Sequence, residues 1–200
     1  MRKTLVAIAV AMAIPAVAAA IPPRTLDNLQ AAFNGESNAH ARYLAFADKA
    51  QQEGYKQVAS LFRAAARAED VHAASHATVI RKLGAVPSAK IETPDVKSTR
   101  ANLLAAIKGE TYERDVMYPE FLRVARAEQQ MDAIRSFTYA KTAEAEHAKL
   151  YTAGERNLES MKSGGVTYYV CTVCGYTTTK LDFEKCPSCF NPKDKYVAVS

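Results

Sequence analysis

The stretches "AEDVHA" (68–73) and "AEAEHA" (143–148) decide the fold of this chain. Each places a glutamate and a histidine three residues apart in Ala-rich sequence that favours a helix. Residues at this spacing share one face of a helix, so Glu69 points the same way as His72, and Glu144 the same way as His147. Burying such a pair costs free energy unless something binds it. The repetition therefore predicts two helices that present matching polar groups to a common interior.

The apolar periodicity around these motifs predicts four long helices, at 25–52, 55–83, from 95 or 98 to 127, and at 130–161. Thr25 is expected to cap the first helix, and Pro119 should kink or divide the third because proline removes an intrahelical hydrogen bond. Residues 84–98 form one long connection that contains two prolines. Four helices with one long crossover are typical of a four-helix bundle, so the chain is predicted to be mainly α.

The bundle is also predicted to contain an internal repeat. The stretch "AAFNGES" (31–37) is similar to "AAIKGET" (105–111), and each precedes a Glu-x-x-His motif by the same distance to within one residue. A glutamate from each of two helices, with Glu-x-x-His from each of the other two, is the ligand set of two iron or manganese ions inside a bundle. Carboxylates neutralise and bridge such ions, and imidazoles complete the coordination. The predicted ligands are Glu36, Glu69, His72, Glu110, Glu144 and His147.

Single glutamates on helices usually face solvent, and this is the expectation for Glu128 and Glu146. The matched repeat argues against that interpretation for the predicted ligands. Glu113 follows Glu110 by one helical turn and lies on the same face. It is either an exposed charge or a carboxylate that binds one metal ion in one oxidation state and gives way to His72 in the other.

Two tyrosines and two histidines near these motifs have weaker signals. Tyr43 and Tyr118 follow the two Gly-Glu motifs. They are interpreted as core residues whose hydroxyl groups could bond a metal-bound carboxylate. His40 and His76 could support the ligands in the same way, but a surface position is favoured for both.

All four cysteines lie near the C-terminus, in "CTVCGY" (171–176) and "CPSC" (186–189). Two Cys-x2-Cys motifs in a short segment fit a tetrahedral site for zinc or iron, with Cys171, Cys174, Cys186 and Cys189 as ligands. An exported chain could instead form disulfides, but this spacing favours a metal. Spacing alone does not choose between zinc and iron, although a redox-active pair of metals in the same chain makes iron more useful.

The first 20 residues have the parts of a secretory signal peptide: a basic start, an apolar stretch and small residues before Ala20. The apolar stretch is short for a bilayer and Pro15 breaks it, so no stable membrane span is expected. Cleavage would place the protein in a periplasm, and an uncleaved segment would anchor it to the membrane. The formal net charge is +5, but the sequence has no run of Lys or Arg residues, so no nucleic-acid partner is expected.

The chain resembles the rubrerythrin family. The resemblance covers residues 24–200 and rests on the stretches "AAFNGESNAHARY", "AEDVHA", "GETYERDVMYPEF", "AEAEHAKLY", "YVCTVCGY" and "CPSC". It implies a ferritin-like di-iron bundle at 21–161, a linker at 162–165 and a rubredoxin-like Fe(Cys)4 domain at 166–200.

The resemblance also implies a role for each site residue. Glu69 and Glu144 would bridge the two irons. Glu36 would be terminal on the first iron, with Glu113 and His72 as its exchanging pair. The second iron would have Glu110 and His147 as terminal ligands, and Tyr43 and Tyr118 would support the site.

The activity that the resemblance implies is reduction of hydrogen peroxide to water in oxidative-stress protection, linked to NADH and rubredoxin. An electron-donor protein would reduce the Fe(Cys)4 centre, which passes electrons to the di-iron site. Family members pair head to tail, so the tail of one subunit is expected near the di-iron site of another. The alternatives are a ferroxidase or iron-handling protein and a non-enzymatic zinc-binding module.

The chain has no tryptophan, so Tyr168, Tyr169, Tyr176 and Phe183 are expected to cover the cysteine site.

Overall fold

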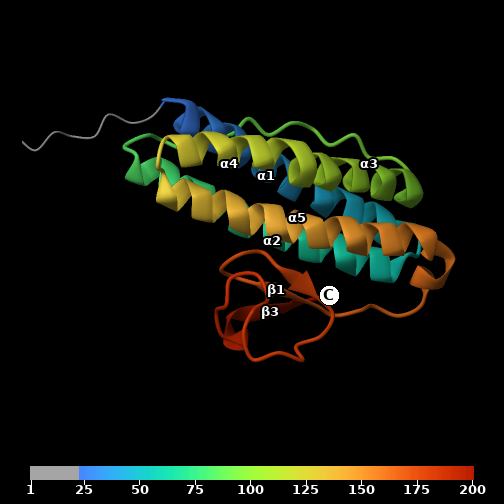
Figure 1. The fold of residues 1–200 in the computed structure, drawn as a ribbon. Helices are drawn as coiled ribbons and strands as arrows, with labels where there is room; N and C mark the ends of the chain where they lie inside the picture. The colour runs from blue at the N-terminus through green and yellow to red at the C-terminus, as the bar shows by residue number, and fades with distance from the viewer. Residues whose placement is uncertain (1–22) are drawn as a thin grey trace, which may run out of the picture.

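The structure is a computed structural model that describes residues 23–200, and the predicted signal peptide at 1–20 lies outside this range. Its helices are α1 (Pro23–Gln52), α2 (Lys56–Lys82), α3 (Thr99–Tyr112), α4 (Tyr118–Ala127) and α5 (Met131–Arg156). In Figure 1 they lie alongside one another as an elongated bundle, with α3 and α4 following one another as a single rod. The prediction of a mainly α four-helix bundle is confirmed. No helix in the described range combines the length and apolarity of a bilayer span.

The third rod is interrupted where the sequence predicts it. A π-helical turn, η1 (Glu113–Met117), joins α3 to α4, and the N–H of Tyr118 donates to the carbonyl of Glu113. Pro119 has no N–H for the carbonyl four residues before it, and its ring crowds that carbonyl. The chain accommodates the proline by widening one turn rather than by ending the rod. Such π-turns are frequent at functional sites, and this one begins at Glu113.

The long connection between α2 and α3 is extended and runs along α1. Amide side chains at one-turn intervals on α1 accept hydrogen bonds from alternate backbone N–H groups of the connection. The pairs are Ser88 to Gln30 (3.2 Å), Lys90 to Asn34 (2.8 Å) and Glu92 to Asn38 (2.8 Å). These bonds satisfy backbone groups that would otherwise need water, and they fix the path of the crossover.

The bundle has two apolar clusters. One includes Tyr43, Phe46, Phe62 and Tyr151, and the other includes Tyr118 and Phe137. Along every rod, the predicted ligands fall between residues of the first cluster and residues of the second. Full burial of one large apolar side chain contributes about 1.5–3 kcal/mol, so the two clusters can hold the rods together on both sides of a costly polar centre.

One helix terminus differs from the sequence prediction. Helix α1 begins at Pro23, and Thr25 does not cap it with its own side chain. Instead, the Thr25 N–H donates to the carboxylate of Glu128 at 3.0 Å, and its hydroxyl donates to the same oxygen. Glu128 is therefore a partner for the start of α1 rather than the solvent-facing charge that was expected. Glu146 is half-buried and pairs with Lys149, three residues further along α5, at 3.0 Å.

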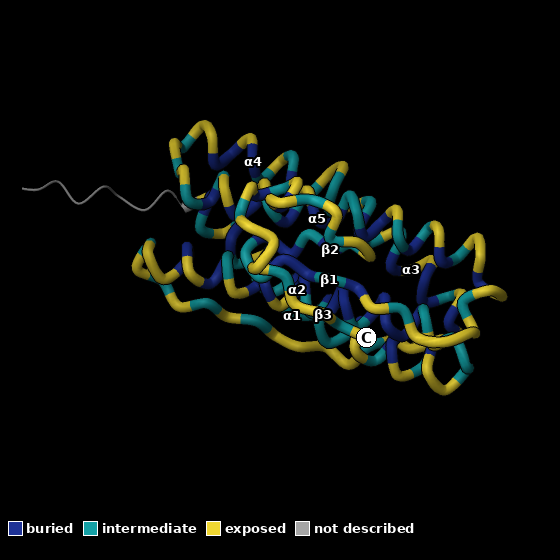
Figure 2. Tube along the Cα trace, turned by 90° about the horizontal axis from the view of Figure 1, so that it is seen from below, coloured by how far each residue is buried: buried dark blue, intermediate teal, exposed yellow. Residues whose placement is uncertain are grey.

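A short 3-10 helix, η2 (Leu158–Lys162), follows α5, and the predicted linker at 162–165 overlaps its end. The remaining chain contains β1 (Tyr168–Cys171), β2 (Thr177–Thr178), a 3-10 turn η3 (Lys193–Lys195) and β3 (Tyr196–Val199). The strands form an antiparallel sheet in the order β2-β1-β3. This small sheet lies against α2 and α5 (Figures 1 and 2).

Candidate metal centres

The six predicted ligands of the bundle meet at one place. They come from α1, α2, α3 and α5, and all six side chains are buried. Their ligand atoms form two groups, and within each group the atoms lie within 4.8 Å of one another. The first group is Glu36, Glu69, His72 and Glu144, and the second is Glu69, Glu110, Glu144 and His147. Glu69 and Glu144 belong to both groups, which is the position of bridging carboxylates.

Both histidines point Nδ1 of the ring toward the carboxylates. Nδ1 of His72 lies 3.0 Å from oxygens of both Glu69 and Glu144. Nδ1 of His147 lies 2.9 Å from Glu144, 3.6 Å from Glu69 and 3.7 Å from Glu110. Each imidazole therefore faces the shared pair of glutamates, one from each end of the cluster.

Unpaired buried atoms show what the cluster requires. Among the described residues, six ligand atoms have almost no exposed surface and no hydrogen-bond partner: Glu36 Oε2, Glu69 Oε1, Glu110 Oε2, both carboxylate oxygens of Glu144, and His147 Nδ1. Leaving such groups unpaired costs several kcal/mol in sum. Four carboxylates and two imidazoles match two divalent cations in charge and donor type. The residues present therefore fit a pair of metal ions.

The other ring nitrogens face the C-terminal segment. Nε2 of His72 lies 3.2 Å from the carbonyl oxygen of Cys174, and Nε2 of His147 lies 3.1 Å from the hydroxyl of Thr177. A carbonyl only accepts, so we assign the proton of His72 to Nε2, which leaves Nδ1 free to bind a cation. Partners of this kind orient metal-binding imidazoles. Thr177 was not identified from the sequence, which carries no motif for it.

Both predicted tyrosines bond to the ligands. Tyr43 donates its hydroxyl to Glu110 at 2.5 Å, and Tyr118 donates to Glu36. His76 is fully buried, 3.1 Å from the Tyr118 hydroxyl, so its predicted surface position is wrong. Burial lowers the pKa of His76 from 6.5 to about 3, which keeps it neutral. His40 is half-buried and bonds to a backbone carbonyl of α2 at 2.8 Å, away from the ligands.

Glu113 stands beside the site without joining either group. It is half-buried at the start of the π-turn, whereas His72 occupies the first ligand group. Burial, followed by the charge of Glu113, raises the pKa of Glu36 well above its usual value. The structure therefore presents His72 toward the metal position and keeps Glu113 close by.

The stability of metal-free protein is expected to fall as the pH rises. Burial, followed by the charge of Glu144, raises the pKa of Glu110 from 4.5 to about 8. Desolvation alone would lower the pKa of His72, but Glu144 and Glu69 raise it from 6.5 to about 10. In both cases the group loses its proton at a higher pH in the folded chain than in the unfolded chain. The free energy of unfolding then declines with pH, by at most about 1.4 kcal/mol per pH unit for each group.

Metal-loaded protein is expected to show the opposite slope, because cations bind deprotonated ligands. Urea unfolding of both forms at about pH 5.5 and about pH 8 measures the two slopes. If the free energy of unfolding changed with pH in the same direction in both forms, metal binding by these residues would be contradicted.

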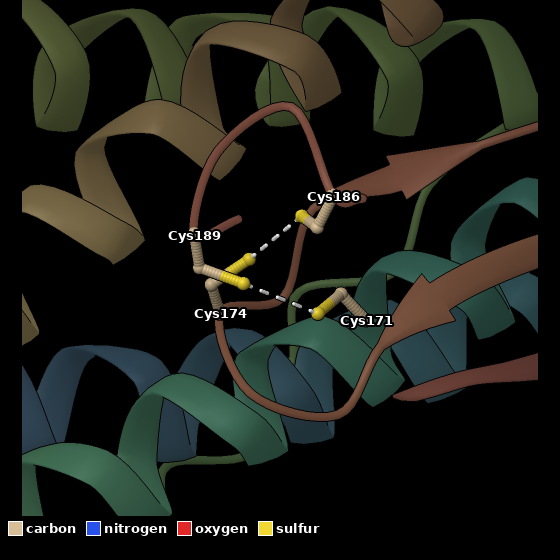
Figure 3. Close-up of side chains that lie close together, drawn as sticks. All are labelled: Cys171, Cys174, Cys186 and Cys189. Atoms are coloured by element: carbon tan, nitrogen blue, oxygen red, sulfur yellow. Dashed lines mark hydrogen bonds between the residues drawn. The ribbon is translucent and has the colours of Figure 1, made fainter. Parts of the chain in front are cut away.

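The four cysteines form the second centre. They are free, and the Sγ atoms lie 3.7 Å apart for Cys171 and Cys189 and 3.6 Å apart for Cys174 and Cys186 (Figure 3). A disulfide needs about 2.05 Å. A tetrahedron with metal–sulfur bonds of about 2.3 Å has edges of about 3.8 Å, so the spacing suits a single metal ion. The disulfide alternative, which the sequence did not favour, is not adopted.

The aromatic cover of this centre differs in part from the prediction. Tyr176 packs against the cysteines, and Phe183 packs on Tyr196, with ring centroids 5.4 Å apart. Tyr168 instead joins the apolar cluster of the bundle. Tyr139 of α5 and Tyr196 of β3 also contact the cysteine cluster. Neither was identified from the sequence, and for Tyr139 its distance along the chain from the cysteines hides the contact.

The cysteine centre lies next to the bundle site of the same chain. Cys174 touches His72 through its carbonyl, and Gly175 is so close that an added Cβ would overlap the imidazole. Within one chain, the short segment after η2 returns the tail along α2, which places it beside the di-iron site of its own chain. The expectation that this tail lies near the di-iron site of another subunit stays a prediction.

Comparisons with known proteins identify the family. The family model described as rubrerythrin matches residues 27–154. Nigerythrin of Nitratidesulfovibrio vulgaris is 41% identical over 175 residues, covering 87% of this chain and 86% of the relative. Rubrerythrin-2 of Clostridium acetobutylicum is 37% identical, covering 87% of this chain and 96% of the relative. A structure of fully reduced, all-ferrous nigerythrin has a TM-score of 0.81 at 40% identity, covering 87% of this chain and 86% of that one.

The ferritin-like architecture and both iron centres follow from these matches together with the geometry. The bundle carries a di-iron site made of carboxylates and imidazoles, and the four cysteines form a rubredoxin-like iron site. The chain belongs to the rubrerythrin family.

Proposed function

We propose that this protein reduces hydrogen peroxide to water with electrons that pass from the Fe(Cys)4 centre to the di-iron site. One observation carries the proposal: the Cys174 carbonyl lies 3.2 Å from Nε2 of the ligand His72. A one-electron centre is thereby one hydrogen bond away from a ligand of a two-metal centre. An oxidoreductase that needs two electrons per turnover benefits from such a contact.

When bound, the two irons supply the two electrons and polarise the peroxide oxygens. Residues of the protein position the site and exclude water from it. Glu69 and Glu144 hold the two positions together, and Tyr43 and Tyr118 fix the carboxylates of Glu110 and Glu36 by hydrogen bonds. Closed apolar clusters on both sides exclude water from the site. Glu113 is proposed to replace His72 as positive charge grows, because the π-turn places a spare carboxylate next to the first ligand group.

Three further features of the proposal rest on the sequence and the family resemblance. An electron-donor protein, linked to NADH or rubredoxin, would reduce the Fe(Cys)4 centre. The chain would form a head-to-tail homodimer. The N-terminal segment would direct the protein to a periplasm, which makes a cytoplasmic donor unavailable after cleavage.

Stopped-flow mixing tests the activity. Fully reduced protein is expected to be oxidised by hydrogen peroxide at least about tenfold faster than by oxygen at equal concentration, since a general acid–base step contributes about a hundredfold or more to peroxide cleavage. Absorbance changes of the two iron centres report the oxidation. Equal or faster oxidation by oxygen would contradict peroxide reduction.

The main rival is a ferroxidase that uses the same bundle but consumes ferrous iron as its substrate. Catalysed oxidation of added ferrous iron with retention of a ferric mineral would favour it. The contact between Cys174 and His72 argues for the peroxidase, because an iron store has no evident use for an attached electron carrier. A zinc-binding module is distinguished by colour, since a Zn(Cys)4 centre has no visible charge-transfer bands.

A further inference from the structure

A continuous line of hydrogen bonds leads from the di-iron site to the surface. It begins at Glu36, which accepts from the Tyr118 hydroxyl. His76 Nε2 lies 3.1 Å from that hydroxyl, and His76 Nδ1 lies 2.8 Å from the Ser136 hydroxyl. Ser136 lies 2.7 Å from the hydroxyl of Ser75. The line crosses from α1 through α4 and α2 to α5 and back to α2, so no single helical motif predicts it.

The outer end of this line opens into a cleft of about 390 Å³. Ser75 and Ser136 line the cleft, together with residues of α2 and α5 and with Thr172 and Val173 of the cysteine segment. Ser136 is 3% exposed and Ser75 is half-buried, so the line reaches water at Ser75. His76 and Tyr118 are completely buried.

The donor directions along the line are consistent. A metal-bound carboxylate accepts only, so Tyr118 donates to Glu36 and must accept from the Nε2–H of His76. The neutral imidazole then has a free lone pair on Nδ1, which accepts from the Ser136 hydroxyl. Ser136 is in turn free to accept from Ser75. Every O–H or N–H bond in the line therefore points inward, toward the metals.

We propose that Ser75, Ser136 and His76 are a proton relay that delivers protons from the cleft to the di-iron site through Tyr118 and Glu36. This inference rests on the peroxide reduction proposed above, in which H2O2, two electrons and two protons give two molecules of water. The electrons enter through Cys174 and His72, on the side of the cysteine centre, whereas the protons enter through Ser75. Glu36 belongs to the ligand set and Tyr118 donates to it, and the three relay residues act through them.

The relay balances one proton for each passage. Water in the cleft gives a proton to Ser75, each hydroxyl passes its own proton inward, and Ser136 protonates Nδ1 of His76 as Nε2 releases its proton to Tyr118. Tyr118 passes its proton to Glu36, from which it reaches the oxygen released from peroxide. His76 is neutral before and after the passage, with its proton moved from Nε2 to Nδ1. The hydroxyl groups must rotate back and His76 must return to its Nε2–H tautomer before a second passage delivers the second proton of the turnover.

Kinetics of two variants test the relay. Ser136→Ala and Ser75→Val are each expected to slow oxidation of fully reduced protein by peroxide at least about tenfold, a conservative share of what proton transfer contributes. The D2O/H2O rate ratio should deviate further from one, because proton delivery becomes rate-limiting. Added imidazole, which fits the cleft, should restore part of the rate. Ser136→Thr retains a hydroxyl and should stay near the wild-type rate.

Ser60→Ala is the matched control. Ser60 is a buried serine of α2, but its hydroxyl bonds to the backbone carbonyl of Lys56 at 3.1 Å and joins no line to the metals. Its variant is expected to keep the wild-type rate and isotope effect. Wild-type rates and isotope effects in both Ser136→Ala and Ser75→Val would overturn the relay.

A second measurement does not depend on turnover. In full-length protein loaded with Zn²⁺, nitrogen NMR of the His76 ring should show a proton on Nε2 and an accepting Nδ1. Exchange of the Nε2 proton with water should slow by at least about tenfold in Ser75→Val, because the exit to the cleft is closed. Unchanged exchange, or a proton on Nδ1 in the resting protein, would contradict the relay. Failure of the wild type to reduce peroxide would instead contradict the proposed function and leave this NMR result independent.

Discussion

The variant Glu69→Ala is expected to bind neither iron of the bundle site. Glu69 belongs to both ligand groups, and its oxygens lie 3.0 Å from Nδ1 of His72 and 3.6 Å from Nδ1 of His147. Removing it withdraws a charge from both positions and leaves Glu144 as the one ligand carboxylate common to both groups. Loss of an outer partner of a metal ligand costs roughly 10–100-fold in affinity, and loss of a bridging ligand should cost more.

Iron analysis of purified protein measures this loss, and the Fe(Cys)4 centre serves as the internal reference. The Fe(Cys)4 centre uses none of the bundle residues, so its visible bands should persist in Glu69→Ala while peroxide reduction is abolished. Glu36→Ala should be milder and retain iron in the second position, because Glu36 belongs to the first group alone. Glu146→Ala, on α5 but paired with Lys149, should retain both irons. Full iron content in Glu69→Ala would exclude a bridging role.

The ligand set could be predicted from the sequence because residue spacing within one helix determines which side chains share a face. Glu-x-x-His fixes two side chains on one helical face, whatever the helix packs against. Two matched copies, each with a partner glutamate on another helix, then require only that four rods enclose one interior. The structure brings together the six residues that this argument selected. Their assignment as iron ligands in the purified protein is tested by the variants above.

The remainder depends on contacts between distant parts of the chain. Nothing near His76 in the sequence indicates that Ser136 and Tyr118 will enclose it, so a surface position was the natural expectation. The amide pairs that hold the crossover join residues more than 50 positions apart. The placement of the cysteine segment is decided by contacts with α2 and α5, about which the Cys-x2-Cys spacing says nothing.

The variant Gly175→Ala is expected to uncouple the two iron centres while leaving both in place. An ideal Cβ at Gly175 would overlap Nε2 of His72 and lie 2.9 Å from its Cδ2. Either the cysteine turn or the imidazole must move, and the bond from His72 to the Cys174 carbonyl is lost in both cases. Electron transfer from the reduced Fe(Cys)4 centre to the oxidised di-iron site should slow severalfold, because the hydrogen bond that links the two centres is lost.

The effect can be separated from backbone strain. Gly175 has φ +75°, a conformation that disfavours alanine, but the second cysteine turn has Phe190 in the corresponding position with φ +59°. This fold of the turn therefore accepts a side chain, and the Fe(Cys)4 bands should survive in Gly175→Ala. Gly54→Ala is the control, because Gly54 has φ +85° and a Cβ there would meet nothing within 4 Å. Stopped-flow absorbance of the Fe(Cys)4 bands measures the transfer, and a wild-type rate in Gly175→Ala would mean that electrons do not cross at His72.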